Sequence, residues 1–517
     1  MRELATLLTD HGLMDRTQES LDEMKAEVTD YDSSLLSSAG ASVYVRSLYR
    51  RGQTIYGIVR TPDRKMLFAA GSGDFETPFP VPIEEDGGVR LQLIPMTKEY
   101  VKPLWELFPF TKPVSLRNRR TTIGMGDRLG LATAGQLQAA RDYNLAPVLA
   151  QQSTRENNFT GRSIEDVVAD AAFLVFQEGY EDGYGADGDH LKDIPGIDEA
   201  LDASIPMITL DLTEVLLPEA ATDDFAAVEA AFDRLDAAYK ERILGEYADK
   251  EFDLDGTAVA ISREQAVRAA VIYSRAIPFT VEVEEHIKSV RGHEYDLEIS
   301  VDETTFRTTP QQHLLFVREL REQGVAINSV APRFIGDFQK AIDYIGDIDQ
   351  FEEDFVLHAA VARGNGGYKI SVHSGSDKLS IYPIVGKHTG KRLHLKTAGT
   401  SWLEALRTIA VANPSLYRRM HEKAHQYYPE ALKSYHITAD IDAIPDLDSV
   451  PDKELPSFLA DDNCRQFLHI SYGGLLNDPE LRSDFFDTLH REEKLHYQHL
   501  EQHFRRHIEL LGIEKRS

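Results

Sequence analysis

The chain has 517 residues, of which 42% are hydrophobic and 27% charged, so it carries enough apolar side chains for a substantial folded core. Its 85 Asp and Glu residues outnumber its 56 Lys and Arg residues, for a formal net charge of −29. Because nucleic acids and anionic membranes attract clustered cations, this surplus disfavours both as partners. The length suggests about three domains or one large barrel with appendages, and it excludes a single small binding module.

The sequence predicts a cytoplasmic location. A lone cysteine, Cys464, excludes an internal disulfide and a Cys-x-x-Cys motif, which fits a reducing compartment. Asp10 and His11 interrupt the N-terminus where a signal peptide would need continuous apolar residues. The sequence also has no run of about 18 uncharged apolar residues, the length that a membrane-spanning helix requires.

Residues 1–115 are predicted to form a separate, β-rich N-terminal cap. Segments 41–46 and 54–60 have strand-like composition and flank a turn at Arg51-Gly52, which predicts a hairpin. Prolines interrupt residues 79–82 and 103–113.

From residue 121 onward, short apolar segments alternate with helical patterns. The predicted strands are residues 121–126, 146–150, 184–189, 206–210, 295–301, 325–330, 368–372 and 393–396. Predicted helices include residues 163–179, 223–244, 263–275, 311–323 and 335–345, the first with a capping-box-like start at Ser163 and Asp166. Eight strand–helix units predict an α/β fold, a TIM-like (β/α)8 barrel over residues 116–430; an open doubly wound sheet is the alternative. A helical insertion at about residues 215–292 and a helical C-terminal extension at residues 431–517 complete the predicted organisation.

Polar side chains follow the predicted strands, where a parallel barrel places its active site. Asp189 and Glu298 are candidate acid/base groups, and His190, His373, His394 and Asp302 are candidate ligands of a divalent cation. Mixed nitrogen and oxygen donors suit Zn, Mn, Ni or Fe. The alternative for a single residue of this kind is a helix cap, or a hydrogen-bonding histidine, because Asp, Ser and Thr often begin the next helix.

Basic and amide side chains at the same strand ends predict a small anionic substrate, held by charge-assisted hydrogen bonds. The candidate substrate-binding residues are Asp127, Arg128, Gln151, Gln152, Lys192, Arg333, Lys378 and Lys396. Lys369 also lies close to a strand end. The alternative for the lysines and arginines is ordinary surface exposure.

Two further patterns are interpreted as structural. Gly124, Gly126 and Gly130 resemble a dinucleotide fingerprint, but Leu129 occupies its third glycine position, so a bound nicotinamide is not expected. Histidines also recur at helical spacing near the C-terminus, and we interpret them as a solvated or interdomain helix face rather than a metal site: His496, His499, His503 and His507.

Several long strings resemble the tagaturonate/fructuronate epimerase family over most of residues 120–430: IGMGDRLGLAT (123–133), PVLAQQSTRE (147–156), FQEGYEDGYGADGDHLK (176–192), APRFIGDFQKAIDYIGD (331–347), YKISVHSGSDK (368–378) and LHLKTAGTSWLEALR (393–407). The resemblance implies a metal-dependent 4-epimerisation of two keto-uronates. It further implies that Asp189 and Glu298 are the acid/base groups and that His190 and His373 are metal ligands. His394 and Asp302 remain open as further ligands.

The proton on C4 of a 2-keto sugar acid is not α to the carbonyl, so its direct removal has no electron sink. Retro-aldol cleavage of the C3–C4 bond, rotation of the aldehyde fragment and re-addition would invert C4 with a Lewis acid and two acid/base groups. A metal-dependent aldose–ketose isomerase, a non-catalytic sugar-acid-binding protein and a glycoside hydrolase are the alternative functions, and a homo-oligomer is compatible with the sequence.

Overall fold

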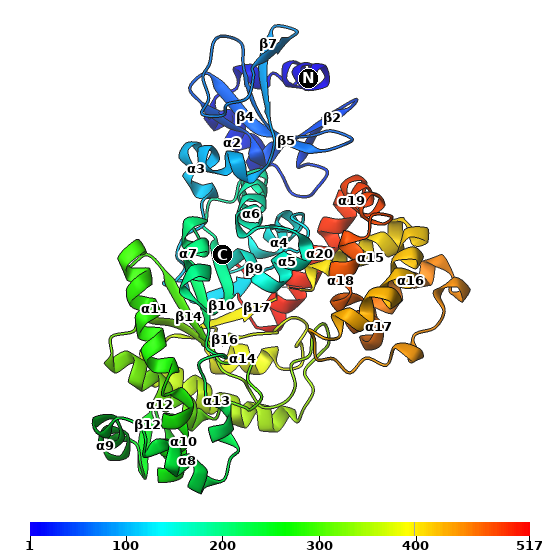
Figure 1. Cartoon of the computed structure of the whole chain (residues 1–517). Helices are drawn as coiled ribbons and strands as arrows, with labels where there is room; N and C mark the ends of the chain where they lie inside the picture. The colour runs from blue at the N-terminus through cyan, green and yellow to red at the C-terminus, as the bar shows by residue number, and fades with distance from the viewer. Residues whose placement is uncertain (398, 517) are drawn as a thin grey trace.

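Eight parallel strands close into a barrel at the centre of the chain, in a computed structural model that describes residues 1–397 and 399–516 (Figure 1). The barrel order is β10-β11-β14-β15-β16-β17-β8-β9. Its strands are β8 (Thr121–Gly124), β9 (Ala146–Ser153), β10 (Gly185–Leu191), β11 (Met207–Asp211), β14 (Asp296–Ser300), β15 (Ile327–Ala331), β16 (Lys369–Val372) and β17 (Leu393–Lys396). Each predicted strand overlaps one of them, so the predicted barrel is confirmed and the open sheet is wrong.

Helices cover the outer face of the barrel, and the barrel interior buries the inner face, so all residues of these strands are buried. Polar and apolar residues alternate in β14, β16 and β17, because their polar side chains turn to the barrel interior. The predicted capping box starts α6, where the Ser163 hydroxyl accepts from the Asp166 amide at 3.2 Å and the Asp166 carboxylate accepts from the Ser163 amide at 2.8 Å. The surrounding helices include α4 (Thr133–Ala140), α5 (Thr154–Thr160), α6 (Ile164–Glu178), α7 (Ile194–Asp202), α12 (Pro310–Glu322), α13 (Ile348–Gly364), α14 (Tyr382–His388) and α15 (Ser401–Ala412).

The segment between β11 and β14 differs from the predicted single long helix over residues 223–244. Asp236 caps a second helix by accepting from the Tyr239 amide at 3.0 Å, and this cap divides the segment in two. A two-stranded hairpin, which the helical prediction missed, follows these helices. In chain order the elements are α8 (Phe225–Phe232), α9 (Ala237–Glu246), β12 (Lys250–Leu254), β13 (Thr257–Ile261), α10 (Arg263–Tyr273) and α11 (Ala276–Arg291).

The helix predicted over residues 335–345 is wrong, because this segment is an irregular loop at the mouth of the barrel. Gly336 and Gly346 both have positive φ, at 88° and 155°, and an antiparallel bridge joins Asp337 to Ile345. Buried Lys378 donates to the carbonyls of Gln339 and Ile342 at 2.7 and 2.6 Å, so these carbonyls are bound by a side chain instead of by a helical backbone.

The N-terminal residues form an antiparallel sheet in the order β1-β2-β4-β5-β7-β6, with β3 on β4. The predicted turn at Arg51-Gly52 joins β3 to β4, and the other predicted strand of the hairpin, β2, also pairs with β4. The sheet packs on the outer side of α6 (Figure 1). Its elements are α1 (Arg2–Asp10), α2 (Gln18–Ala26), β1 (Leu35–Ser38), β2 (Ala41–Tyr44), β3 (Tyr49–Arg51), β4 (Thr54–Arg60), β5 (Lys65–Gly71), β6 (Glu84–Asp86), β7 (Val89–Ile94) and α3 (Val101–Leu107).

The C-terminal residues form helices beside the barrel, α16 (Pro414–Ala431), α17 (Asp462–Ile470), α18 (Tyr472–Asn477), α19 (Arg482–Arg491) and α20 (Glu493–Leu510). The last of these packs against α4 and α15, so its histidine face is interdomain rather than solvated. His503 and His507 nevertheless form, with Asp377, a group of ligand atoms that could hold a metal ion, so the metal alternative stays open. His496 and His507 are buried, while His503 and His499 lie 2.9 Å from the hydroxyls of Thr400 and Thr408. Among the described residues, we find no helix with the length and apolar character needed to cross a membrane.

Candidate active site

A buried ion cluster lies inside the mouth of the barrel, around the ammonium group of Lys396 at the end of β17. The Lys396 Nζ atom is 2.8 Å from Asp187, 2.6 Å from Asp189 and 3.0 Å from Glu298. It also donates to the Thr209 hydroxyl at 2.6 Å. Asp187 and Asp189 are two residues apart on β10, so strand alternation turns both side chains to the barrel interior. The cluster draws its members from four strands whose carboxyl ends converge.

The Lys396 ammonium determines the charge state of these carboxylates. Burial opposes ionisation of Asp189, but Lys396 outweighs it and lowers the pKa of Asp189 to about 2. Burial likewise opposes ionisation of Glu298, and Lys396 with His373 holds its pKa well below the usual range. For Asp187 burial prevails and raises the pKa to about 6. Asp189 and Glu298 are therefore ionised at neutral pH.

Three side chains beside this cluster could hold a metal ion. Candidate ligand atoms of His190, Asp302 and His373 all lie within 4.8 Å of one another. The His373 ring places Nδ1 at 2.9 Å from Asp302 and Nε2 at 2.6 Å from Glu298. The ring centroids of His190 and His373 are 5.1 Å apart. We refer to His190, Asp302 and His373 as the ligand trio.

The surroundings of the trio fit a cation. Nδ1 of His190 lies 3.3 Å from buried Asp211, an arrangement in which a carboxylate orients a ligating imidazole. Burial disfavours the imidazolium of His190, yet Asp189 and Asp211 raise its pKa to about 10. The carboxylates of Asp189, Asp211, Asp302 and Glu298 thus give the site an excess of negative charge, which a divalent cation would offset. His190 itself has a left-handed backbone, with φ at 56°.

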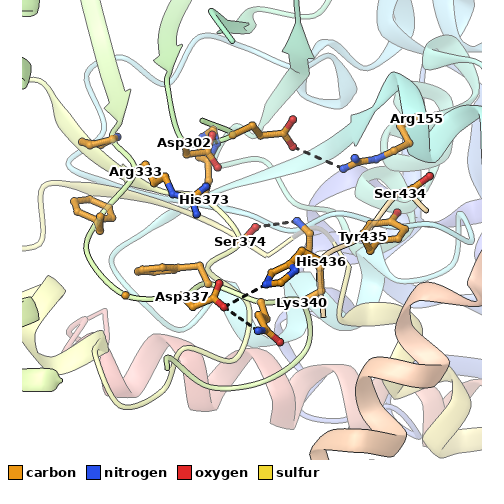
Figure 2. Close-up of a pocket in the computed structure, with 16 residues that line it drawn as sticks. Arg155, Asp302, Arg333, Asp337, Lys340, His373, Ser374, Ser434, Tyr435 and His436 are labelled. Atoms are coloured by element: carbon orange, nitrogen blue, oxygen red, sulfur yellow. Dashed lines mark hydrogen bonds and ion pairs between the residues drawn. The ribbon is translucent and has the colours of Figure 1, made fainter. Parts of the chain in front are cut away.

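Two adjoining cavities open onto this chemistry. The inner cavity, of about 60 Å³, is lined by Asp189, His190, Lys396 and Arg128. The outer cavity, of about 220 Å³, extends toward the C-terminal residues Ser434, Tyr435 and His436 (Figure 2). The residues that line both cavities are Arg155, Asp302, Glu303, Lys340, His373 and Ser374.

Some of the predicted substrate-binding residues are engaged elsewhere. Asp127 accepts from the backbone amides of Leu129, Gly130 and Ala132, so it organises the turn after β8. Lys378 donates to the backbone carbonyls of Gln339, Ile342 and Ser376, and it lines neither cavity. Lys192 pairs with Glu214 at 3.3 Å and also lines neither cavity.

Arg128 and Arg333 do line the cavities. Arg128 contributes to the inner one, where it pairs with Glu156 at 2.6 Å and lies 3.8 Å from the centre of the Tyr472 ring. Arg333 contributes to the outer one, and its guanidinium donates to the Thr304 carbonyl.

The two glutamines of β9 face opposite ways. The register of β9 against β10 shifts between Gly185 and Ala186, so Gln151 pairs with Asp187 and shares its inward face. The Gln151 amide fills the space that Gly124 leaves, since a Cβ at Gly124 would lie 2.1 Å from it. Gln152 pairs with Gly188, which faces Ala200 of α7, and therefore points to the helix layer.

His394 is not brought to the ligand trio. It precedes Lys396 by two residues on β17 and so lies deeper inside the barrel, where its Nδ1 is 2.9 Å from the Thr122 hydroxyl. Burial lowers its pKa to about 3, so the ring is neutral. These contacts fit a hydrogen-bonding histidine of the barrel interior.

The sequence reasoning missed several residues of the site. Asp187 could have been found, because it precedes Asp189 by two positions on one strand. Thr209 and Ser329 bind the carboxylates of Asp187 and Glu298, but neutral hydroxyls gave no signal. Arg155 lies two residues after the end of β9, as Asp302 does after β14, so its position could also have been found. Lys340 lies in a loop well beyond the end of β15.

Comparison with known proteins identifies the family of the chain. The family model described as tagaturonate epimerase matches residues 44–511. The chain belongs to the tagaturonate epimerase family. The tagaturonate/fructuronate epimerase of Thermotoga maritima is 37% identical over 472 residues, covering 91% of this chain and 97% of the relative.

Solved structures of the family have the same fold. A glycerol complex of the fructuronate-tagaturonate epimerase UxaE from Cohnella laeviribosi is 42% identical, with a TM-score of 0.87, and the match covers 91% of this chain and 96% of that one. The native crystal structure of the same enzyme has the same identity and TM-score, with coverage of 92% and 97%. Membership of this family makes the chain an epimerase, an enzyme of the isomerase class, and confirms the family that the sequence resembled.

Proposed function

We propose that the protein interconverts D-tagaturonate and D-fructuronate by inverting C4, with a divalent cation held by the ligand trio. The observation that carries the proposal is the pair of ionised carboxylates, Asp189 and Glu298, on either side of Lys396 and next to that trio. The named activity of the relatives supports the choice of substrate.

The trio would supply two nitrogen donors and one oxygen donor, a set that suits Zn, Mn, Ni or Fe. A cation bound there would act as a Lewis acid that stabilises negative charge developing on the ketone oxygen of the substrate. Asp211 orients His190, and Glu298 fixes the ring of His373, so the protein's own contacts hold the donor atoms in place.

Retro-aldol chemistry gives the carboxylates their roles. One carboxylate accepts the proton of the hydroxyl on C4, the C3–C4 bond breaks, and its electron pair forms the C2–C3 enediolate while C4 becomes an aldehyde. After the aldehyde rotates, C3 of the enediolate attacks the other face of the aldehyde carbon. The C3–C4 bond forms again, and the resulting C4 alkoxide takes up a proton. Because that oxygen leaves on one side and returns on the other, a proton-handling group is needed on each side, and Asp189 and Glu298 take these two places.

Carbon NMR of fructuronate incubated with the protein tests the reaction. We expect tagaturonate to form in the presence of a divalent cation and to stop forming after chelation. Asp189→Asn and Glu298→Gln should each lower kcat by roughly 10²–10⁴-fold while leaving the fold intact. An aldose product would instead favour the isomerase alternative, and absence of turnover with every cation would favour a binding protein.

A trapping experiment tests the retro-aldol route. A hydrazine reagent present during turnover should capture a small amount of three-carbon aldehyde, because cleavage releases such a fragment whenever it escapes re-addition. Complete absence of fragment, with tightly bound nicotinamide in the purified protein, would refute the route. The cytoplasmic location stays a prediction from the sequence, and a homo-oligomer stays compatible with it.

A further inference from the structure

We propose that Arg155 and Lys340 bind the carboxylate of the substrate and that this anchor retains the carboxylate-bearing fragment while the C3–C4 bond is open. The inference rests on the proposed function and concerns two residues outside the substrate-binding set that the sequence predicted.

Most cations near the barrel mouth are occupied. Lys396 is surrounded by three carboxylates and a hydroxyl. Arg128 is bound to Glu156 and covered by the Tyr472 ring. Lys192 and Lys378 line neither cavity. Arg333 lines the outer cavity but not the inner one, and its guanidinium donates to the Thr304 carbonyl. A carboxylate entering the cavities would therefore meet few available cations there.

Arg155 and Lys340 differ from these in two respects. Both line the inner and the outer cavity, and both keep donors free. Lys340 donates once, to the Ser374 hydroxyl at 2.8 Å, and in the described part of the chain it takes part in no ion pair. Arg155 has one long ion pair, 3.8 Å from Glu303, and its side chain is 40% exposed. A guanidinium and an ammonium with free donors can together bind a carboxylate through charge-assisted hydrogen bonds.

Contacts with neighbouring side chains hold both groups at the cavity wall. The Arg155 guanidinium lies 5.0 Å from the centre of the Tyr435 ring, in the C-terminal segment that walls the outer cavity. The partner of Lys340, Ser374, follows His373 in the chain, so Lys340 is tied to the loop that carries a predicted metal ligand. Figure 2 shows Arg155 and Lys340 on the side of the cavity next to Ser434 and Tyr435, with His373 and Asp302 across from them.

This placement has a consequence for the open intermediate. Cleavage between C3 and C4 leaves the carboxylate on the aldehyde fragment, which must turn over without leaving. A carboxylate bound by Arg155 and Lys340 fixes one end of the aldehyde fragment, while the C4 aldehyde group stays free to rotate. Arg155 and Lys340 thereby retain the aldehyde fragment in the site as well as binding the substrate.

Kinetics of Arg155→Met and Lys340→Met test the assignment, with Lys387→Met as a matched control, because the side chain of Lys387 is 68% exposed on α14. Each cavity variant should raise KM for the keto-uronates roughly tenfold or more. The trapped three-carbon aldehyde per turnover should rise as well, a change that a merely structural role would not produce. Glycerate should inhibit the wild type more strongly than glycerol, and this difference should shrink in both cavity variants but not in the control.

The outcomes separate this assignment from the proposed function. A wild type that fails to epimerise either keto-uronate overturns both. A wild type that epimerises, with cavity variants whose KM, fragment release and glycerate inhibition match the control, overturns the assignment alone. Should the methionine variants unfold, Arg155→Lys decides: it keeps the charge but loses the planar fork, so an unchanged KM and unchanged fragment release would contradict the assignment.

Discussion

Replacing Lys396 with methionine would leave three buried carboxylates without the cation that they share. The ammonium lies within 3.0 Å of Asp187, Asp189 and Glu298, while methionine keeps much of the side-chain volume. Removing one partner of a buried ion pair costs about 3–5 kcal/mol, because the remaining charge is uncompensated. We expect a loss of that size in the free energy of unfolding of Lys396→Met at neutral pH, together with loss of epimerase activity.

The loss should depend on pH, since carboxylates escape the penalty by binding protons. Without the ammonium, burial raises the folded-state pKa values of these carboxylates above their unfolded-state values. Burial already has this effect on Asp187 in the wild type, where it raises the pKa to about 6. Such groups stabilise the fold below their unfolded pKa, and this contribution is lost as the pH rises through the folded pKa. The folded variant then binds one proton more than its unfolded chain. Its loss of unfolding free energy relative to the wild type therefore grows by about 3 kcal/mol between about pH 5.5 and about pH 7.5.

Urea unfolding across this pH range measures the effect, with Lys369→Met as the control. Lys369 is a buried lysine on the neighbouring strand β16, and its Nζ atom donates to the Leu116 carbonyl and the Thr122 hydroxyl at 3.3 Å. Burial lowers its pKa to about 8, so it stays largely protonated over the range and its removal should cost a nearly constant amount. Parallel pH profiles for the two variants would refute the reasoning.

Two further variants probe the attachment of the C-terminal helices to the barrel. Burial opposes ionisation of Asp377, but Arg465 at 2.7 Å outweighs burial and lowers the pKa of Asp377 to about 2. Asp377→Asn should therefore lower the free energy of unfolding by about 2 kcal/mol at neutral pH. This cost should shrink progressively as the pH falls from about 4 to about 2. An equal cost at both ends of a pH series of urea unfolding would contradict this. A Cβ at Gly386 would lie 2.0 Å from the Leu511 carbonyl, so Gly386→Ala should lower the free energy of unfolding by about 1–3 kcal/mol. Gly245→Ala, in α9 with nothing within 4 Å of its Cβ, should be neutral or stabilising in the same urea unfolding assay.

The rule that parallel strands converge at their carboxyl ends predicted the core of the site. It placed Asp189, His190, Glu298, Asp302 and His373 together from three separate segments, and the structure brings these five side chains together. Four of them line the cavities, and Glu298 lies behind these four against His373 and Lys396. The prediction was possible because barrel topology alone fixes which ends meet.

The same rule could not tell how far up the barrel a side chain lies or where a loop directs it. His394 shares a strand and a face with Lys396 but lies two residues, about 7 Å, deeper. The β9 bulge decides that Gln151 faces inward and Gln152 outward, and no composition signal marks it. Asp127 and Lys378 follow strands yet bind backbone groups, because the turns after those strands need partners for their amides and carbonyls.

The metal content of the purified protein tests the central claim most directly. Elemental analysis should find about one divalent cation per chain in the wild type, and His190→Ala and His373→Ala should each lose it together with epimerase activity on fructuronate. His394→Gln should retain the cation, since His394 lies outside the trio. Full occupancy in both alanine variants, or turnover that survives removal of all metal, would contradict the account.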